Sequence, residues 1–159
     1  MNSNRRLTSR SLAKAAVLDR KLIRHLASFR YQLRQFLRFS ETAARAVGVT
    51  PQQHQLLLGV AGHTDRGWAT IGELAEFLQE RHNAVVGLVE RAARRGLVRK
   101  TPGERDRRFV CVHLTPRGAG FLLQLSRLHR EEAGLLVSRA LMAVVPLRRS
   151  RTRRRLASL

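Results

Sequence analysis

The chain has 159 residues, enough for one domain with additional helices, and its 31 lysines and arginines against 11 acids give a formal net charge of +20. A charge of this size favours a polyanionic partner, which leaves DNA, RNA and acidic membrane surfaces as candidates. The one cysteine, Cys111, excludes an intramolecular disulfide and a cysteine-based zinc site and is compatible with a reducing cytosol. The apolar run at 140–145 ends at Pro146 and is too short to span a bilayer.

The basic residues are concentrated in three parts of the chain. Seven lie in residues 1–24, nine in residues 81–108 and seven in residues 139–159. We interpret residues 1–17 as a basic N-terminal arm, for which a transit peptide of similar composition is the alternative. The acid-free residues 148–159 are typical of a solvated basic tail.

An amphipathic helix is predicted over residues 18–37. Apolar side chains recur there in steps of four and three, close to a heptad seam. They are Leu18, Leu22, Leu26, Phe29, Leu33 and Phe36. A stripe of this kind needs a partner surface.

Two shorter helices are predicted from capping boxes. Thr50 is followed by Pro51 and, three residues on, by Gln53, and Thr70 with Glu73 repeats the pattern. The first helix is expected to end near Gly62. The intervening "DRGWAT" predicts a turn and one short strand.

A third helix is predicted over residues 81–95, followed by a hairpin. The expected inner face of the helix is Val85, Leu88, Val89 and Ala92, and Gly96 is suited to end it. Strands at 97–100 and 109–114, joined by a polar loop, form the hairpin. In its second strand Val110, Val112 and Leu114 are expected on one side. Thr115 and Pro116 then begin another helix, which carries Leu122, Leu125 and Leu128.

Residues 49–114 therefore predict a winged helix-turn-helix, which binds DNA by placing its last helix in the major groove. Arginine there can pair with guanine and asparagine with adenine, and an exposed valine can touch a thymine methyl group. The candidate DNA-reading residues are Arg81, His82, Asn83, Val86 and Arg91.

The hairpin tip supplies the second candidate contact. Arg105, Arg107 and Arg108 are expected to face the DNA backbone and the minor groove, whose negative potential attracts arginine. Asp106 lies two residues before Arg108, and we interpret it as a brace that orients that side chain.

The combined pattern resembles the MarR-type transcriptional regulators over roughly residues 20–135. The resemblance rests on "GLVRKTPGERDRRFVCVHLTPRG", with G-L-V, D-x-R in the wing and L-T-x-x-G, and on "IGELAEFL". It departs from the family at the third helix, which opens with Arg81 and His82 in place of serine or threonine. Val86 and Gly87 occupy the middle, where the family usually carries polar side chains.

The resemblance implies a mainly α fold with a small β-hairpin wing, in which N- and C-terminal dimerisation helices, at 18–48 and 115–147, flank the winged helix-turn-helix core. It also implies a cytoplasmic homodimer on a near-palindromic double-stranded operator, a repressor in many relatives. A small aromatic effector is a further implied partner, with its site expected between the dimerisation helices and the DNA-binding lobe.

We therefore expect a transcriptional regulator that is not an enzyme and needs no cofactor, metal or membrane. An architectural DNA-binding protein without effector control remains an alternative, as does an RNA-associated basic protein. The few aromatic residues argue against the stacking surface that single-stranded RNA needs. Trp68 and Phe77 could line a ligand pocket, although such residues more often pack in the core. Cys111 is expected to be a packing residue rather than a redox switch, and His113 and His129 are not expected to bind metal.

Overall fold

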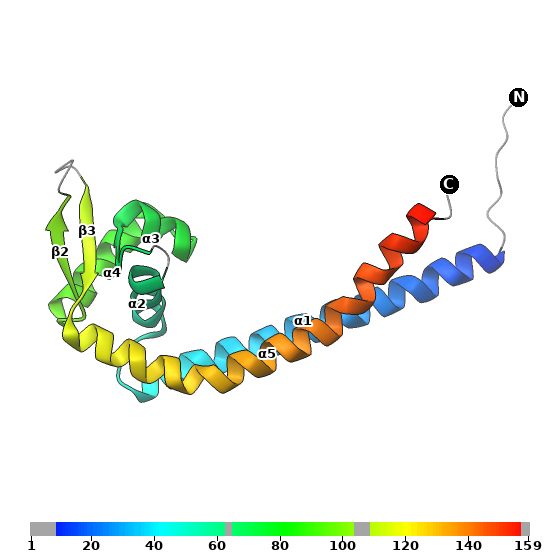
Figure 1. The fold of residues 1–159 in the computed structure, drawn as a ribbon, viewed down its shortest axis with the longest axis horizontal. Coiled ribbons are helices and arrows are strands. Elements are labelled where there is room, and N and C mark those ends of the chain that lie inside the picture. The colour runs from blue at the N-terminus through cyan, green and yellow to red at the C-terminus, as the bar shows by residue number, and fades with distance from the viewer. Residues whose placement is uncertain (1–8, 63–64, 104–108, 157–159) are drawn as a thin grey trace, which may run out of the picture. The chain divides into compact units, whose positions relative to one another are not determined.

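The computed structural model describes residues 9–62, 65–103 and 109–156 (Figure 1). In chain order the elements are α1 (Ser9–Ala46), α2 (Pro51–Gly62), β1 (Trp68–Thr70), α3 (Ile71–Leu78), α4 (His82–Arg94), β2 (Val98–Pro102), β3 (Val110–Leu114) and α5 (Pro116–Leu156). The chain divides into a winged-helix unit, Arg38–Arg130, and a helical unit formed by the remaining parts of α1 and α5. The predicted class, mainly α with a small β wing, is confirmed.

Both predicted capping boxes are present. The amide of Gln53 donates to the Thr50 hydroxyl, and the amide of Thr50 donates to Oε1 of Gln53, each at 3.1 Å. At α3 the amide of Glu73 donates to Thr70 Oγ1 at 3.2 Å, and Glu73 Oε2 accepts from the Thr70 amide at 2.8 Å. These bonds satisfy amides that would otherwise lack partners, and they fix where both helices begin.

The core of the winged-helix unit lies where α2, α3, α4 and the sheet meet. The predicted inner face of α4 is buried, with each of its four side chains at most 8% exposed. Leu56, Leu57 and Val60 of α2 and Leu74 of α3 are fully buried against it. The hydrophobic effect on these side chains drives the helices together and leaves the opposite face of α4 to solvent.

The sheet is antiparallel with strand order β1-β3-β2. Val112 of β3 and its partner Ala69 of β1 are fully buried on the core side. Val110 alternates with Val112 along the same strand but is 38% exposed. Strand β1 pairs only with Cys111–His113, so Val110 lies beyond the part of the sheet that covers the core.

A tight joint connects the end of α4 to the start of α5. The Thr115 hydroxyl lies 2.6 Å from the Gly96 carbonyl oxygen, to which it donates, and it accepts from the amide of Gly118. A β carbon at Gly118 would lie 2.0 Å from the carbonyl oxygen of Leu97. The G-L-V segment at 96–98 and the L-T-x-x-G segment at 114–118 therefore contact each other. Gly118 is needed there because a side chain would prevent its backbone from lying so close to that of Leu97.

Two helices extend beyond the predicted boundaries. Helix α1 begins at Ser9, inside the expected N-terminal arm, and α5 continues through Pro146 to Leu156, inside the expected tail. Both segments are rich in alanine, leucine, lysine or arginine, which are strong helix formers. The distribution of charge therefore did not indicate where these helices end. Helix α5 also continues past Pro146, whose backbone has no N–H to donate a hydrogen bond within the helix.

The helical unit exposes many large apolar side chains. On α1 they include Leu22, Ile23, Leu26, Leu33 and Leu37, between 37% and 62% exposed, and on α5 Leu135 and Val137 at 46% and 57%. Within this unit the guanidinium of Arg139 lies 3.4 Å from Oε1 of Gln32. Among the described residues, no helix is long and apolar enough to cross a membrane.

Candidate nucleic-acid interface

The turn between α3 and α4 sets the direction in which α4 leaves the core. Gln79 ends α3 with φ at 54°, a left-handed conformation, and its amide donates to the carbonyls of Ala75 and Glu76. Arg81 is the N-cap of α4, and its side chain makes no capping hydrogen bond within the described chain. Unlike α2 and α3, α4 thus begins with an arginine and without a side-chain cap, and a helix N-terminus of this kind suits a phosphate group.

The first turn of α4 places the predicted DNA-reading side chains in solvent. Arg81, His82 and Asn83 are all exposed. Farther along, Val86 is 36% exposed and Arg91 is exposed. The structure therefore puts the five residues on the solvent side of one helix, opposite its buried face.

The centre of the outward face of α4 includes two residues that the sequence analysis did not name, Glu90 and Arg94. Asn83, Gly87, Glu90 and Arg94 follow one another at steps of four, three and four, so they lie in one row along the helix. Arg94 is exposed and adds a cation at the last turn of α4. The helical spacing from Asn83 was the signal that could have identified it.

Gly87 leaves space that Arg91 uses. A β carbon at position 87 would lie 3.3 Å from Nη1 of Arg91, so the guanidinium lies over the middle of the outward face. The backbone at Gly87 is therefore covered by the Arg91 side chain. The absence of a side chain at Gly87 allows a flexible, charged donor group from the next turn to cover the position.

The wing is connected to α4 by an ion pair. Nζ of Lys100 on β2 contacts Oε1 of Glu90, and both side chains are partly exposed. Exposed pairs of this kind contribute little to stability, typically under about 1 kcal/mol. The pair joins β2 to α4 and offsets the negative charge of Glu90 on the outward face of the helix.

Arg95 is a structural residue. Its Nη1 donates to Oε1 of Gln53 at 2.6 Å, and its Nη2 donates to the carbonyl of Gly48 at 2.7 Å. The guanidinium therefore joins the end of α4 to the N-terminal cap of α2. No local sequence pattern predicts these contacts, because they join residues 42 and 47 positions apart.

The predicted wing contacts Arg105, Arg107 and Arg108, and the brace Asp106, lie outside the described residues. The two described arms of the hairpin lead to them, since Gly103 donates its amide to the carbonyl of Phe109 at 2.9 Å. Those four assignments remain predictions from the sequence.

The remaining residues that the sequence analysis singled out lie elsewhere in the winged-helix unit. Phe77 is 36% exposed, and a β carbon at Gly59 would lie 2.8 Å from its ring, so it packs on α2 from the edge of the core. His129 of α5 lies against the rings of Phe39 and His54, at centroid distances of 5.3 and 5.0 Å. Among the described residues, no three histidines, cysteines or acids are grouped to hold a metal ion.

Residues 47–108, which contain α2, α3, α4 and β2, match the model of the MarR family. The transcriptional activatory protein BadR of Rhodopseudomonas palustris is 35% identical to the chain over 89 residues, which are 55% of this chain and 51% of BadR. The chain spans only about half the length of the curated relatives it matches.

Solved structures share the MarR fold. The MepR–DNA complex from S. aureus covers 82% of this chain and 95% of MepR, with a TM-score of 0.62 and 21% identity. A cysteine-to-serine mutant of MarR from E. coli in complex with operator DNA covers 78% of this chain and 88% of that one, with a TM-score of 0.61 and 21% identity. At this level of identity the likeness establishes the fold.

Proposed function

We propose that this chain is a transcriptional regulator of the MarR type that binds double-stranded DNA in a sequence-specific manner, with α4 in the major groove. The observation that carries the proposal is the division of α4 into a fully packed inner face and an outward face with asparagine and arginine donors. Asn83 supplies the paired donor and acceptor that suit adenine, and Arg81 suits guanine or a phosphate group. A regulator of this kind acts in the cytoplasm, and it functions without enzymatic activity.

The charge distribution supports binding to the DNA backbone around these base contacts. Arg91 and Arg94 lie on the outward face of α4, and Arg99 is exposed on β2. The acid on this face, Glu90, is paired with Lys100. Binding to phosphates releases counterions and therefore weakens with salt.

The proposal includes a homodimer formed through α1 and α5. The exposed leucines of the helical unit would otherwise leave a large apolar surface in water. A two-fold dimer would present two copies of α4 about 34–36 Å apart, one turn of DNA, to a near-palindromic operator. Sedimentation at micromolar concentration tests this, and a folded monomer that binds an operator with full affinity would contradict it.

The backbone contacts are tested by the salt dependence of affinity for random-sequence duplex DNA. Arg94→Ala is expected to reduce the slope of log affinity against log salt by about one unit. Arg45→Ala is the matched control, because Arg45 is an exposed arginine in the last turn of α1 and pairs with Glu41. If both substitutions have the same effect, the charge of the whole chain rather than the α4 surface determines binding.

The direction of regulation is a separate question from operator binding. The sequence resemblance suggests a repressor, whereas the relative with 35% identity is named as an activator. The proposed contacts of α4 and the wing are the same in both cases, because each requires recognition of a specific site.

A further inference from the structure

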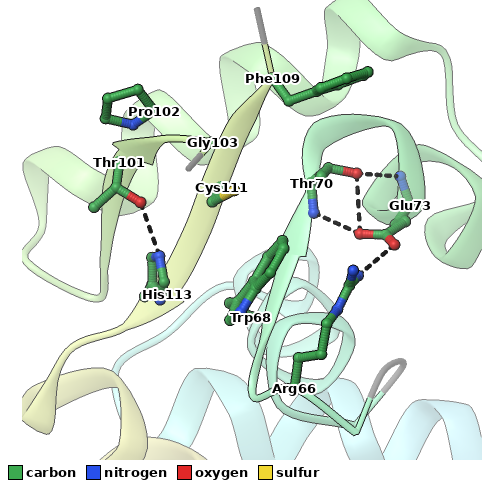
Figure 2. Close-up of a pocket in the computed structure, with 10 residues that line it drawn as sticks. All are labelled: Arg66, Trp68, Thr70, Glu73, Thr101, Pro102, Gly103, Phe109, Cys111 and His113. Atoms are coloured by element: carbon green, nitrogen blue, oxygen red, sulfur yellow. Dashed lines mark hydrogen bonds and ion pairs between the residues drawn. The ribbon is translucent and has the colours of Figure 1, made fainter. Parts of the chain in front are cut away.

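We propose that the outer face of the three-stranded sheet holds a binding site for a neutral, planar aromatic molecule. A pocket of about 720 Å³ opens there, within the usual range for small-molecule sites (Figure 2). We call it the sheet-face pocket. Its lining residues are Arg66, Trp68, Thr70, Glu73, Thr101, Pro102, Gly103, Phe109, Cys111 and His113.

The strand register brings the lining residues together. Cys111 in the central strand pairs with Thr70 on one side and Thr101 on the other, so all three share a face of the sheet. His113 pairs with Trp68 and shares the same face. The neighbouring residues Ala69 and Val112 are buried in the core, so the outer face is a second surface, separate from the outward face of α4.

The walls of the pocket are suited to an aromatic ring. The indole of Trp68 is half-buried, and the Phe109 ring is 57% exposed at the other side of the pocket (Figure 2). The Cys111 side chain, only 6% exposed, lies between them on β3. A flat apolar molecule gains from the burial of both faces against such surfaces.

The charged residues of the pocket neutralise each other. Nη2 of Arg66 contacts Oε1 of Glu73, and the guanidinium carbon of Arg66 lies 4.0 Å from the centre of the Trp68 ring. Burial alone would raise the pKa of Glu73, but hydrogen bonds from Thr70 and Arg66 outweigh it and hold that pKa below its ordinary value. The Glu73 carboxylate is therefore ionised at neutral pH, and it offsets the attraction that Arg66 would otherwise exert on a ligand carboxylate.

One polar position remains for a hydroxyl group or ring nitrogen of the ligand. Oγ1 of Thr101 and Nε2 of His113 lie 2.9 Å apart. Burial and the nearby charge of Arg99 lower the pKa of His113, so its ring is neutral at neutral pH. A hydroxyl has one donor and two acceptor positions, so Thr101 can bond to a ligand hydroxyl while it contacts the histidine.

The position of the pocket connects it to the wing. Thr101, Pro102 and Gly103 form the end of one hairpin arm, and Phe109 begins the other. A bound molecule would touch both arms where they lead to the basic tip. Any effect on DNA affinity rests on the proposed function, and by linkage DNA would then change ligand affinity by the same factor.

The test uses the full chain without DNA, so that its outcome does not depend on the proposed function. The probes are 2-naphthol and 2-naphthoate, which match in shape and differ in charge at neutral pH. Calorimetry measures their affinities, and the rate of iodoacetamide labelling reports on the chain's single cysteine, which lines the pocket. We expect 2-naphthol to bind and to slow labelling, and 2-naphthoate to bind roughly tenfold more weakly.

Two adjacent substitutions localise the site. Phe109→Ala removes one wall and is expected to weaken 2-naphthol binding by about fivefold. Val110→Ala is the matched control, because Val110 is also partly exposed but is absent from the pocket lining. Equal affinities for the two variants, absence of 2-naphthol binding, or tighter binding of 2-naphthoate would each overturn the proposal.

Discussion

Gly118 in the first turn of α5 lies so close to Leu97 that a β carbon at position 118 would be 2.0 Å from the Leu97 carbonyl oxygen. A backbone atom cannot move aside as the end of a side chain can. We therefore expect Gly118→Ala to lower the free energy of unfolding by about 2–4 kcal/mol. Urea denaturation of the purified chain measures this change.

Gly120, two residues farther along the same helix, is the control for that substitution. A β carbon there would have no atom within 4 Å. Gly120→Ala is expected to leave stability unchanged or to raise it by up to about 1 kcal/mol, because alanine favours helix. If the two variants are equally stable, the close approach at Gly118 does not determine how α5 joins the sheet.

Because His54 is buried, we expect the free energy of unfolding to fall in mild acid. Burial and the nearby His129 lower the pKa of His54 from 6.5 to about 4. Between these values the unfolded chain takes up a proton that the folded chain excludes. The stability that neutral His54 contributes is therefore fully present above pH 6.5 and is lost as the pH falls toward 4. The free energy of unfolding falls by at most about 1.4 kcal/mol per pH unit in this range.

Unfolding free energies at a series of pH values test this, with His54→Leu as the non-titrating variant. That variant should lose most of the slope between pH 6.5 and 4, although His113 contributes with the same sign because its pKa is also lowered. An unchanged slope in His54→Leu would show that other groups control the acid sensitivity.

The elements predicted well were those with local causes. The two capping boxes fixed the starts of α2 and α3, and the period of 3.6 identified all four buried residues of α4. The end of α3 was harder, because Gln79 adopts the left-handed conformation that usually marks a glycine. The contacts of Arg95 with Gln53 and Gly48 had no sequence signal, because they join residues 42 and 47 positions apart.

The candidate site was only partly predictable for the same reason. Spacing along one helix was enough to place Asn83 and Val86 on the outward face. The sheet-face pocket depends on the register of three strands, so the sequence could name Trp68 as a possible pocket residue but could not show which residues line the cavity with it. Charge was a poor guide to the chain ends, where helix-forming residues extend α1 and α5.

The wing brace inferred from the sequence makes a prediction opposite to that of net charge. Asp106→Ala adds one positive charge, yet it should weaken binding to operator and random DNA alike if Asp106 orients Arg108. Arg105→Ala and Arg107→Ala should likewise weaken binding to all sequences, each with a salt slope smaller by about one unit. Fluorescence anisotropy at two salt concentrations measures these effects. Tighter binding of Asp106→Ala to both DNAs would show that the acid only moderates the charge of the loop.

Selection of bound sequences from random duplex DNA tests the central claim, recognition of a specific site by α4, most directly. The parent chain should enrich a two-fold symmetric motif with half-sites about one helical turn apart. The Asn83→Ala variant should lose preference at one position in each half-site, at a cost of roughly 1–3 kcal/mol on the parent motif. A flat profile for the parent chain, or an Asn83→Ala profile identical to that of the parent, would contradict the account.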